Sequence, residues 1–552
     1  MSTAPPSPAS LEIFKHLFAS IAEEMGVTLG RTAFSPNIKE RLDFSCAVFT
    51  GAGQLLAQAL HIPVHLGAMP ASVQAALARC APFAPGDVVA LNDPYLGGTH
   101  LPDLTLVSPV FALSTASAPD APAGSRPLFF VASRAHHADI GGMAPGSMPL
   151  STEIYQEGLI IPPIKLVEAG RRNEAVWALI LNNVRTPDER SGDLAAQLAA
   201  HAIGARRALE IVERYGWEAV QAHAAALLGY AEHVARRVIA AIPPGRYSAE
   251  DFLEPADPQA ELIPLRVAVT VRGDTLTADF TGTAPAVSGN LNAVRAIVES
   301  ALGYVLRCLA GPGLPLNAGA FAPLAVTLTP GSLLDARRPS AVAAGNVETS
   351  QRLVDVLFRA LAPALPDLIP AASQGTMNNV TCGRRHPDTG RPFAYYETMG
   401  GGAGAGPGGP GASGVHVHMS NTRNTPVEVL EYAYPLRVER YALRVGSGGA
   451  GLHPGGAGLQ RDLRFLAPVR VTVLSERRRL APWGLQGGGP GTPGENVVEI
   501  DGVATALPAK FTLDLPAGAL LSVRSPGGGG WGRTERALRE EHAPGQAEDN
   551  AV

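Results

Sequence analysis

Hydrophobic residues recur at three- and four-residue spacing near the start of the chain. Over residues 11–25 the apolar positions fall on one helical face, so the sequence predicts a core-facing helix that Ser10 caps and Gly26 ends. The same periodicity predicts further helices over residues 198–212, 220–238, 288–309 and 350–361. Gly216 separates the first two of these, which indicates an antiparallel helical hairpin.

Shorter apolar runs, broken by glycine, proline and Asn-Asp, predict strands. The predicted strands cover residues 88–91, 104–111 and 128–132, a hairpin within 264–280, and most of 427–531, with a second hairpin at Asp501-Gly502. Nine of the fifteen residues in 400–414 are glycine, so a loop is predicted there.

Together these elements predict an α/β plus β fold with a multi-layer mixed architecture. We expect one unit over residues 9–532 and divide it as follows: an N-terminal α/β region at about 9–245, a helical and mixed middle at 246–425, and a β-rich C-terminal region at 426–532, before a polar tail at 533–552.

Composition narrows the classes of function. The chain has 46% hydrophobic and 17% charged residues and a net charge of −5, and its longest basic run is residues 477–479, so nucleic acid is not an expected partner. Its four cysteines form no Cys-x-x-Cys pair, which argues against a disulfide framework and a cysteine-ligated zinc site. The sequence has no run of about 18 apolar residues and no leader pattern. We therefore expect a soluble cytoplasmic protein that is not attached to a membrane.

Candidate chemistry concentrates on two segments, residues 92–103 and 133–139. If the strands at 104–111 and 128–132 pair in antiparallel fashion, His100, Asp103 and either His136 or His137 meet at one end of the sheet. Two imidazoles and a carboxylate suit Mn²⁺, Fe²⁺ or Zn²⁺ and leave coordination positions for water or substrate. The competing interpretation is that these side chains cap turns and satisfy buried carbonyls.

Other polar residues are ambiguous on sequence grounds. Asp93 and Asp139 could orient a ligand imidazole or move protons, although Asn-Asp-Pro also suits an Asx-turn at Asp93. Pro63 lies between His61 and His65 and argues against a helical metal pair, which favours structural roles. The remaining candidates are His416 and His418, which alternate along a predicted strand, and residues 345–350, where helix capping is the simpler role.

Familiar nucleotide and nucleophile motifs are missing from the sequence. It contains no P-loop and no G-x-S-x-G elbow, and the glycine spacing at 404–409 lacks the strand and helix that a dinucleotide site needs.

The ordered motifs of the whole chain are similar to those of the hydantoinase B/oxoprolinase family. The resemblance covers about residues 9–532 and rests on residues 37–45, 92–103, 133–142, 155–158, 182–188, 345–350, 416–426 and 526–532. Members include the B-type subunits of ATP-dependent hydantoinases, the C-terminal half of 5-oxoprolinases, and a related large subunit of acetone carboxylases. The resemblance implies a divalent metal ion, with Mn²⁺ favoured over Zn²⁺ or Fe²⁺, at His100, Asp103 and His136, with His137 as the alternative to His136.

The resemblance also implies a division of labour. ATP and Mg²⁺ are expected on a hydantoinase A-type partner subunit in a hetero-oligomer, which fits the missing P-loop. This chain would then be the B-type subunit of a hydrolase that opens a five-membered cyclic amide with a metal-bound water, while Asp93, Asp139 or His137 handles protons. Two alternatives remain open at this stage: a subunit of a ketone carboxylase, and a non-catalytic scaffold for the A-type subunit.

Overall fold

A computed structural model describes residues 6–65, 67–112 and 126–534. The predicted polar tail at 533–552 therefore lies almost wholly outside the described residues. The helices are α1 Pro8–Thr32, α2 Pro36–Lys39, α3 Ala68–Cys80, α4 Glu174–Asn182, α5 Pro187–Tyr215, α6 Trp217–Ala240, α7 Arg295–Ala310, α8 Ala318–Phe321, α9 Ser350–Leu361 and α10 Val427–Ala433.

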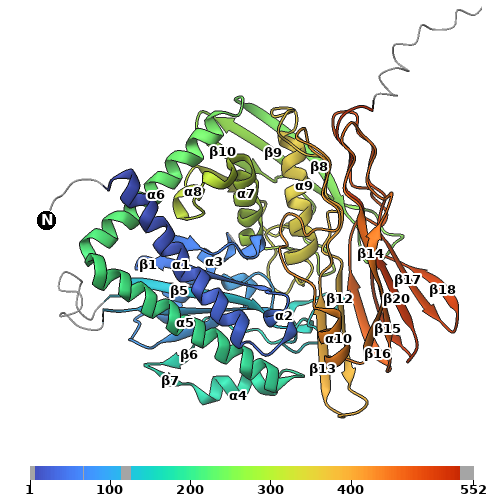
Figure 1. Cartoon of the computed structure of the whole chain (residues 1–552), viewed down its shortest axis with the longest axis horizontal. Coiled ribbons are helices and arrows are strands. Elements are labelled where there is room, and N and C mark those ends of the chain that lie inside the picture. Colours follow the sequence, from blue (N-terminus) through green and yellow to red (C-terminus); the bar gives the residue numbers. More distant parts are fainter. Residues whose placement is uncertain (1–5, 66, 113–125, 535–552) are drawn as a thin grey trace, which may run out of the picture.

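The strands confirm the mixed α/β plus β class, and they form four open sheets (Figure 1). Their bounds are β1 Phe44–Thr50, β2 Leu55–Gln58, β3 Val88–Leu91, β4 Asp103–Val110, β5 Phe129–His136, β6 Ile164–Glu168, β7 Arg171–Arg172, β8 Gly245–Leu253, β9 Ile263–Arg272, β10 Thr275–Asp279, β11 Leu324–Thr327, β12 Asn379–Arg385, β13 Pro392–Glu397, β14 Leu436–Arg444, β15 Gly458–Phe465, β16 Val469–Leu474, β17 Glu495–Ile500, β18 Val503–Leu507, β19 Lys510–Leu515 and β20 Leu520–Arg524.

The N-terminal region is built on a seven-stranded antiparallel sheet in the order β2-β1-β5-β4-β3-β6-β7. Alternate residues of β5 pack on opposite sides: Val131 contacts the cluster that includes α1 and α5, and Ala132 the cluster that includes α3. Every residue of β4 and β5 is buried as a result. The predicted pairing of these two strands is confirmed, and it sets Asp103 opposite His136.

The first helix is longer than the sequence analysis predicted. Ser7, not Ser10, caps α1: its hydroxyl accepts a hydrogen bond from the backbone N–H of Ser10 at 3.1 Å. The helix also continues through Gly26 to Thr32. A Cβ on Gly26 would lie 2.7 Å from the ring of His61, so this glycine allows a close approach and does not end the helix.

The middle of the chain combines helices with a four-stranded sheet in the order β11-β10-β9-β8. The two predicted helices on either side of Gly216 are present as α5 and α6, and the predicted β9–β10 hairpin is confirmed. α9 coincides with its predicted range, whereas α7 begins later than residue 288. Asn292 explains this difference, because its side chain binds the backbone of Val287 and Gly289 and holds the preceding segment in an irregular loop.

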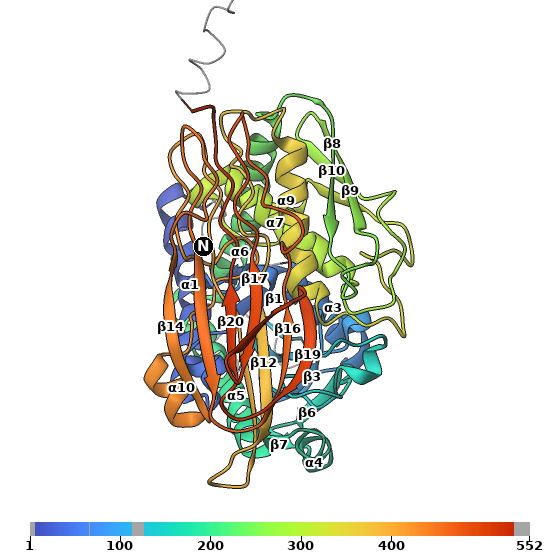
Figure 2. The ribbon, with the colours of Figure 1, turned by 90° about the vertical axis from the view of Figure 1, so that its right-hand side faces the viewer.

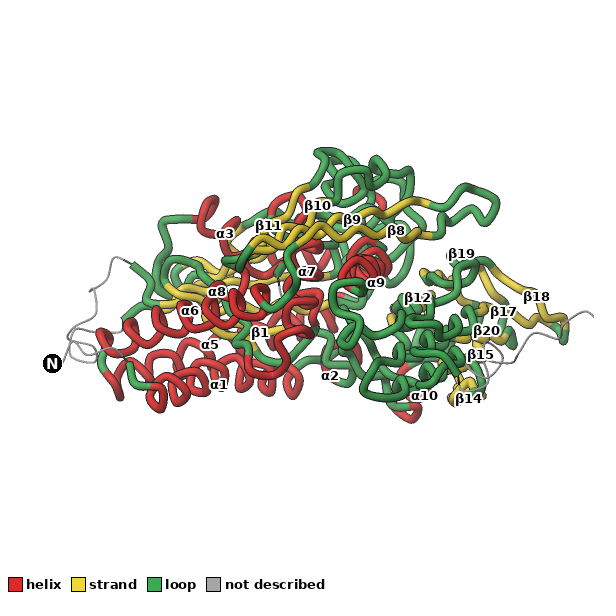
Figure 3. Tube along the Cα trace, turned by 90° about the horizontal axis from the view of Figure 1, so that it is seen from above, coloured by secondary structure: helices red, strands yellow, loops and turns green. Residues whose placement is uncertain are grey.

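The C-terminal region is a β-sandwich. One sheet has the order β13-β12-β16-β19 and the other β14-β15-β20-β17-β18, and side chains of both meet in one apolar cluster. The predicted hairpin at Asp501-Gly502 is the β17–β18 pair. Figure 2 views the sheet β14-β15-β20-β17-β18 face-on. Figure 3 shows the sandwich to one side of the helical layers, with α9 between the sandwich and those layers.

Four glycine-rich segments, at 400–414, 446–458, 484–494 and 526–532, pack against one another beyond the ends of the sandwich strands (Figure 2). We call them the glycine bundle. Their backbones hydrogen-bond between segments, and a Cβ on Gly528 would lie 1.9 Å from the Ala403 carbonyl oxygen. Residues 400–414 are therefore outside regular strands, as predicted, but they are packed tightly between neighbouring backbones.

The prediction of a strand carrying His416 and His418 is wrong. Only an isolated bridge between Gly401 and Val415 forms there, because His418 takes a left-handed backbone conformation (φ 54°) that no continuing strand allows. Across the described part of the chain, no helix has the length and apolar character needed to cross a bilayer.

Candidate metal centre

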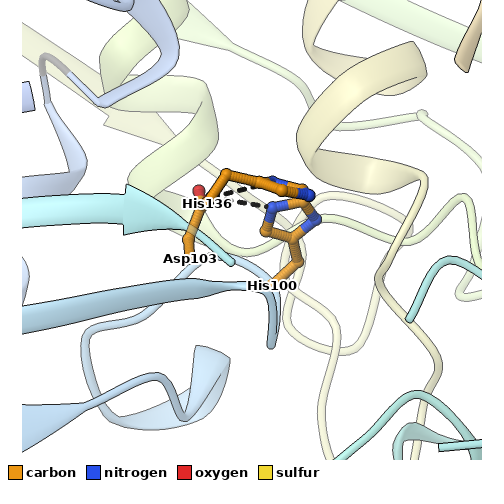
Figure 4. Close-up of side chains that lie close together, drawn as sticks. All are labelled: His100, Asp103 and His136. Carbon is orange, nitrogen blue, oxygen red and sulfur yellow. Dashed lines mark hydrogen bonds and ion pairs between the residues drawn. The ribbon is translucent and has the colours of Figure 1, made fainter. Parts of the chain in front are cut away.

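Asp103, His100 and His136 converge at the end of the β4–β5 hairpin (Figure 4). One carboxylate oxygen of Asp103 lies 3.0 Å from His100 Nε2 and 3.2 Å from His136 Nδ1. The three candidate ligand atoms lie within 4.8 Å of one another, and all three side chains are buried. The pairing of β4 with β5 produces this meeting, since it places Asp103 directly across from His136.

A compact turn between β3 and β4 holds His100. The Asn92 amide donates to the carbonyls of Leu101 and Leu159, and its oxygen accepts from the backbone N–H of Ile161. Gly98 permits the turn, because a Cβ there would lie 2.3 Å from the Asn92 carbonyl oxygen. The glycines and the asparagine of residues 92–98 thus fix the backbone that leads into His100.

A third imidazole, His65, also contacts Asp103. It belongs to the short 3₁₀ turn Pro63–His65, and its Nε2 lies 3.3 Å from the second carboxylate oxygen. Its Nδ1 lies 2.7 Å from the Ser45 hydroxyl of β1. Pro63 favoured a structural role for His65, but the structure brings this imidazole to the same carboxylate as His100 and His136. No spacing rule reveals this contact, because it joins segments that are remote in the sequence.

Asn346 completes the polar surround of the cluster. Its amide nitrogen lies 3.1 Å from His100 Nε2 and 3.4 Å from Asp103, and its amide oxygen is buried without a hydrogen-bond partner among the described residues. Asn346 lies in a π-helical turn, Gly345–Thr349, which leads directly into α9. Such turns often occur at functional sites, so residues 345–350 do more than cap a helix.

The hydrogen bonds of His100 leave one nitrogen facing the carboxylate. Its Nδ1 lies 3.1 Å from the Ala343 carbonyl oxygen, to which it can only donate. In the neutral ring, Nε2 then carries a lone pair, which faces a carboxylate oxygen of Asp103. Two acceptors that face each other repel, so this contact is unfavourable unless a proton or a metal cation lies between them. Burial disfavours the charged ring, but the Asp103 carboxylate outweighs it and raises the pKa of His100.

Charges around Asp103 keep it ionised. Burial by itself would raise its pKa, but the neighbouring His100 and His65 hold that pKa well below its usual value. Burial lowers the pKa of His136, and its Nε2 has no hydrogen-bond partner in the described part of the chain. Imidazole nitrogens around an ionised carboxylate, with a backbone carbonyl holding one ring, fit a divalent cation of the Mn²⁺, Fe²⁺ or Zn²⁺ type.

A buried glutamate supports this arrangement from behind. Glu157 accepts hydrogen bonds from the backbone N–H groups of Val342 and Ala343, both at 2.9 Å, and Ala343 in turn accepts from His100. Burial raises the pKa of Glu157 to about 7. The glutamate therefore fixes the peptide that orients the His100 ring.

Three residues predicted to take part in catalysis make their contacts elsewhere. His137 follows His136 but its Nε2 lies 3.1 Å from Gln197, and burial, with the charge of Arg190, lowers its pKa to about 4. Asp139 forms an ion pair with Arg185 at 2.8 Å, and Asp93 pairs with Arg338 and caps a turn through the backbone N–H of Tyr95. We therefore leave His137, Asp139 and Asp93 out of the cluster.

Comparison with curated proteins places these features in a family context. The family model for hydantoinase B/oxoprolinase matches residues 7–534. An uncharacterised protein of Methanocaldococcus jannaschii is 41% identical over 95% of this chain and 90% of its own length. The 5-oxoprolinase 1 of Arabidopsis thaliana is 42% identical over 95% of this chain, which spans only 41% of that longer protein. A protein of a Pseudomonas species, provisionally named as the B-type subunit of a D-/L-hydantoinase, is 32% identical over 95% of this chain and 90% of its own length.

Two solved structures share the fold. The ATP-dependent caprolactamase from Pseudomonas jessenii superposes with a TM-score of 0.87 at 27% identity, covering 98% of this chain and 94% of that one. A nucleotide-free acetone carboxylase superposes with a TM-score of 0.85 at 18% identity over 96% of this chain and 76% of that one, a likeness that concerns the fold alone. From the extent of the family match and the identity with these relatives, this chain belongs to the hydantoinase B/oxoprolinase family.

Proposed function

We propose that this chain is the B-type subunit of an ATP-dependent amidohydrolase that opens a small cyclic amide. The observation that carries the proposal is the buried contact of Asp103 with His65, His100 and His136 at the end of a rigid β-hairpin. Relatives named 5-oxoprolinase and hydantoinase, and a structural neighbour named caprolactamase, support a cyclic amide as the substrate class.

His100, Asp103 and His136 would hold a divalent metal ion, with Mn²⁺ favoured and Zn²⁺ or Fe²⁺ as alternatives. Such an ion acts as a Lewis acid that lowers the pKa of a water molecule and polarises a carbonyl. The protein supplies the rest: Asp103 provides the negative charge, Glu157 orients His100 through Ala343, and burial of these side chains excludes bulk water.

ATP would be used on an A-type partner subunit, with Mg²⁺, to activate the amide oxygen before the ring opens on this chain. Two points support the partner: the sequence lacks a P-loop, and one relative is named as one component of a multi-subunit hydantoinase. A hetero-oligomer in the cytoplasm follows as part of the same proposal.

The test is a reconstituted assay with the A-type protein, ATP and a panel of hydantoin, 5-oxoproline and small lactams. Ring opening coupled to ATP hydrolysis is expected for at least one amide, and it should disappear in His100→Ala and after chelation of the metal. Turnover that survives both changes would contradict the metal centre. Consumption of bicarbonate with a ketone, and no ring opening, would instead assign carboxylation.

A further inference from the structure

A second candidate site is a cavity of about 560 Å³ between α7, α9 and the glycine bundle. Tyr304 of α7 and Phe358 of α9 contribute aromatic walls, and Ile369 adds an aliphatic one. The polar groups in the same space are the imidazoles of His416 and His418, together with serine hydroxyls and an asparagine amide. This volume falls in the range that binds small organic ligands.

His418 contributes a polar group to the cavity wall, and its contact with Asp355 holds the ring in place. The residue is 7% exposed, and its Nε2 lies 3.2 Å from Asp355, which in turn pairs with Arg477 at 2.7 Å. The hydrogen bond to Asp355 uses Nε2 and leaves the second ring nitrogen, Nδ1, for a ligand. The backbone of His418 is left-handed (φ 54°), a costly conformation for a histidine that is found at functional positions.

His416 adds a buried nitrogen that lacks a hydrogen-bond partner among the described residues. Its Nδ1 contacts the Ser420 hydroxyl at 2.8 Å, whereas its Nε2 is buried and lacks a hydrogen-bond partner in the described part of the chain. Burial lowers the pKa of His416 to about 4, so the ring is neutral near pH 7. The neutral His416 ring can donate or accept, which matches the N–H and C=O of an amide.

Charge restricts the ligand further. Among the described residues that line the cavity, none is Lys, Arg, Asp or Glu. A ligand carboxylate would lose its hydration here without a counter-charge, which is costly, whereas an uncharged ring would not. The lining therefore selects for neutral ligands.

One short segment links the cavity to the metal centre. Pro63 lines it and begins the turn that carries His65, while the Val64 N–H donates to the Met419 carbonyl beside His418. From the other side, Gln351 of α9 donates to the Val417 carbonyl. The rim includes the exposed residues Cys308 and Leu368, so a group attached to a bound ring has room to extend outward.

We propose that this cavity binds the ring of an uncharged cyclic amide, and that His418 Nδ1 is the hydrogen-bond partner of the amide group. The proposal rests on the proposed function, whose substrate class it narrows from cyclic amides in general to those whose ring carries no carboxylate. It predicts discrimination between 2-pyrrolidinone and 5-oxoproline, two rings that differ by one carboxylate.

Cys308 offers a direct binding assay, because it is exposed at the cavity rim. Alkylation by iodoacetamide is followed at Cys308 by peptide mass spectrometry, with Cys80, which lies outside the cavity, as the internal control. Although Cys308 is exposed as a residue, desolvation of its sulfur raises the pKa of the thiol, so labelling is run at about pH 9. 2-Pyrrolidinone should slow alkylation of Cys308 at least threefold and saturably, and 5-oxoproline should require at least tenfold higher concentrations.

The variant His418→Asn removes the imidazole but keeps a residue type that tolerates the left-handed backbone. It should abolish protection by 2-pyrrolidinone while the rate at Cys80 stays unchanged. Absence of protection by 2-pyrrolidinone, equal protection by 5-oxoproline, or full protection in His418→Asn would each overturn the proposal.

A second variant separates this inference from the proposed function. In His100→Ala, protection of Cys308 should persist although ring opening with the A-type protein is lost. Protection without any ATP-dependent ring opening in the unmodified protein would refute the function and leave the binding site standing. Ring opening that needs His100, without protection of Cys308, would refute the binding site alone.

Discussion

Replacing Asp103 by asparagine tests the metal centre most directly, because it removes one charge and almost no volume. A unit positive charge 3 Å from a carboxylate oxygen, the separation seen for His100, interacts by about 5 kcal/mol at an effective dielectric constant of 20. Even half of that energy corresponds to about a hundredfold change in affinity. We therefore expect Asp103→Asn to weaken binding of Mn²⁺ or Zn²⁺ at least a hundredfold.

The measurement is competition with a chromophoric chelator, with bound metal quantified by mass spectrometry. Asp87→Asn is the matched control: Asp87 is also buried and pairs with Lys165 at 3.0 Å, away from the cluster. The control should keep its metal even if it loses some stability. Equal metal affinity in Asp103→Asn and the unmodified protein would refute the assignment of this carboxylate as a ligand.

Three further predictions concern the cluster, the pH dependence of stability and the glycine bundle. His65→Gln should lower metal affinity about 10- to 100-fold in the same competition assay, because its imidazole supports Asp103; unchanged affinity would make His65 purely structural. Burial lowers the pKa of His201 to about 3, so the unfolded chain takes up its proton first as the pH falls below about 6.5. Denaturation should therefore show a loss of about 2 kcal/mol of stability from this residue between pH 8 and pH 5, and a pH dependence undiminished in His201→Gln would contradict this. Gly528→Ala should lower Tm, since its Cβ would overlap a carbonyl oxygen, whereas Gly229→Ala in α6, with open space around it, should raise Tm slightly; equal shifts would argue against the packing described.

The sequence supported the central part of the site because that part depends on a local hairpin. Once two neighbouring runs are assigned as antiparallel strands, alternation and register bring Asp103 and His136 together without further information. Helix α9 could be predicted equally well, because its apolar periodicity begins where its polar first turn indicates a helix start. These are features in which short-range pattern and final packing agree.

Contacts that join remote segments could not be predicted in this way. His65 reaches Asp103 only because a 3₁₀ turn after β2 folds back over the sheet, and Asn346 arrives from a π-helical turn some 240 residues away. Helix α3 was missed for a different reason: its buried positions include Ala68 and Ala76, whose small side chains give a weak hydrophobic signal. The left-handed backbone of His418 likewise could not be predicted, because this conformation is uncommon for any residue other than glycine.

The glycine bundle has a consequence for how this protein is made. Its last segment hydrogen-bonds to all three others, through Gly402 to Pro526, Gly456 to Gly528 and Gly489 to Gly530. A nascent chain lacks this segment until residues 526–532 have been translated and have left the ribosome. The first three segments must therefore stay unassembled until the fourth has been made, and during this stage chaperones and proteases have access to them.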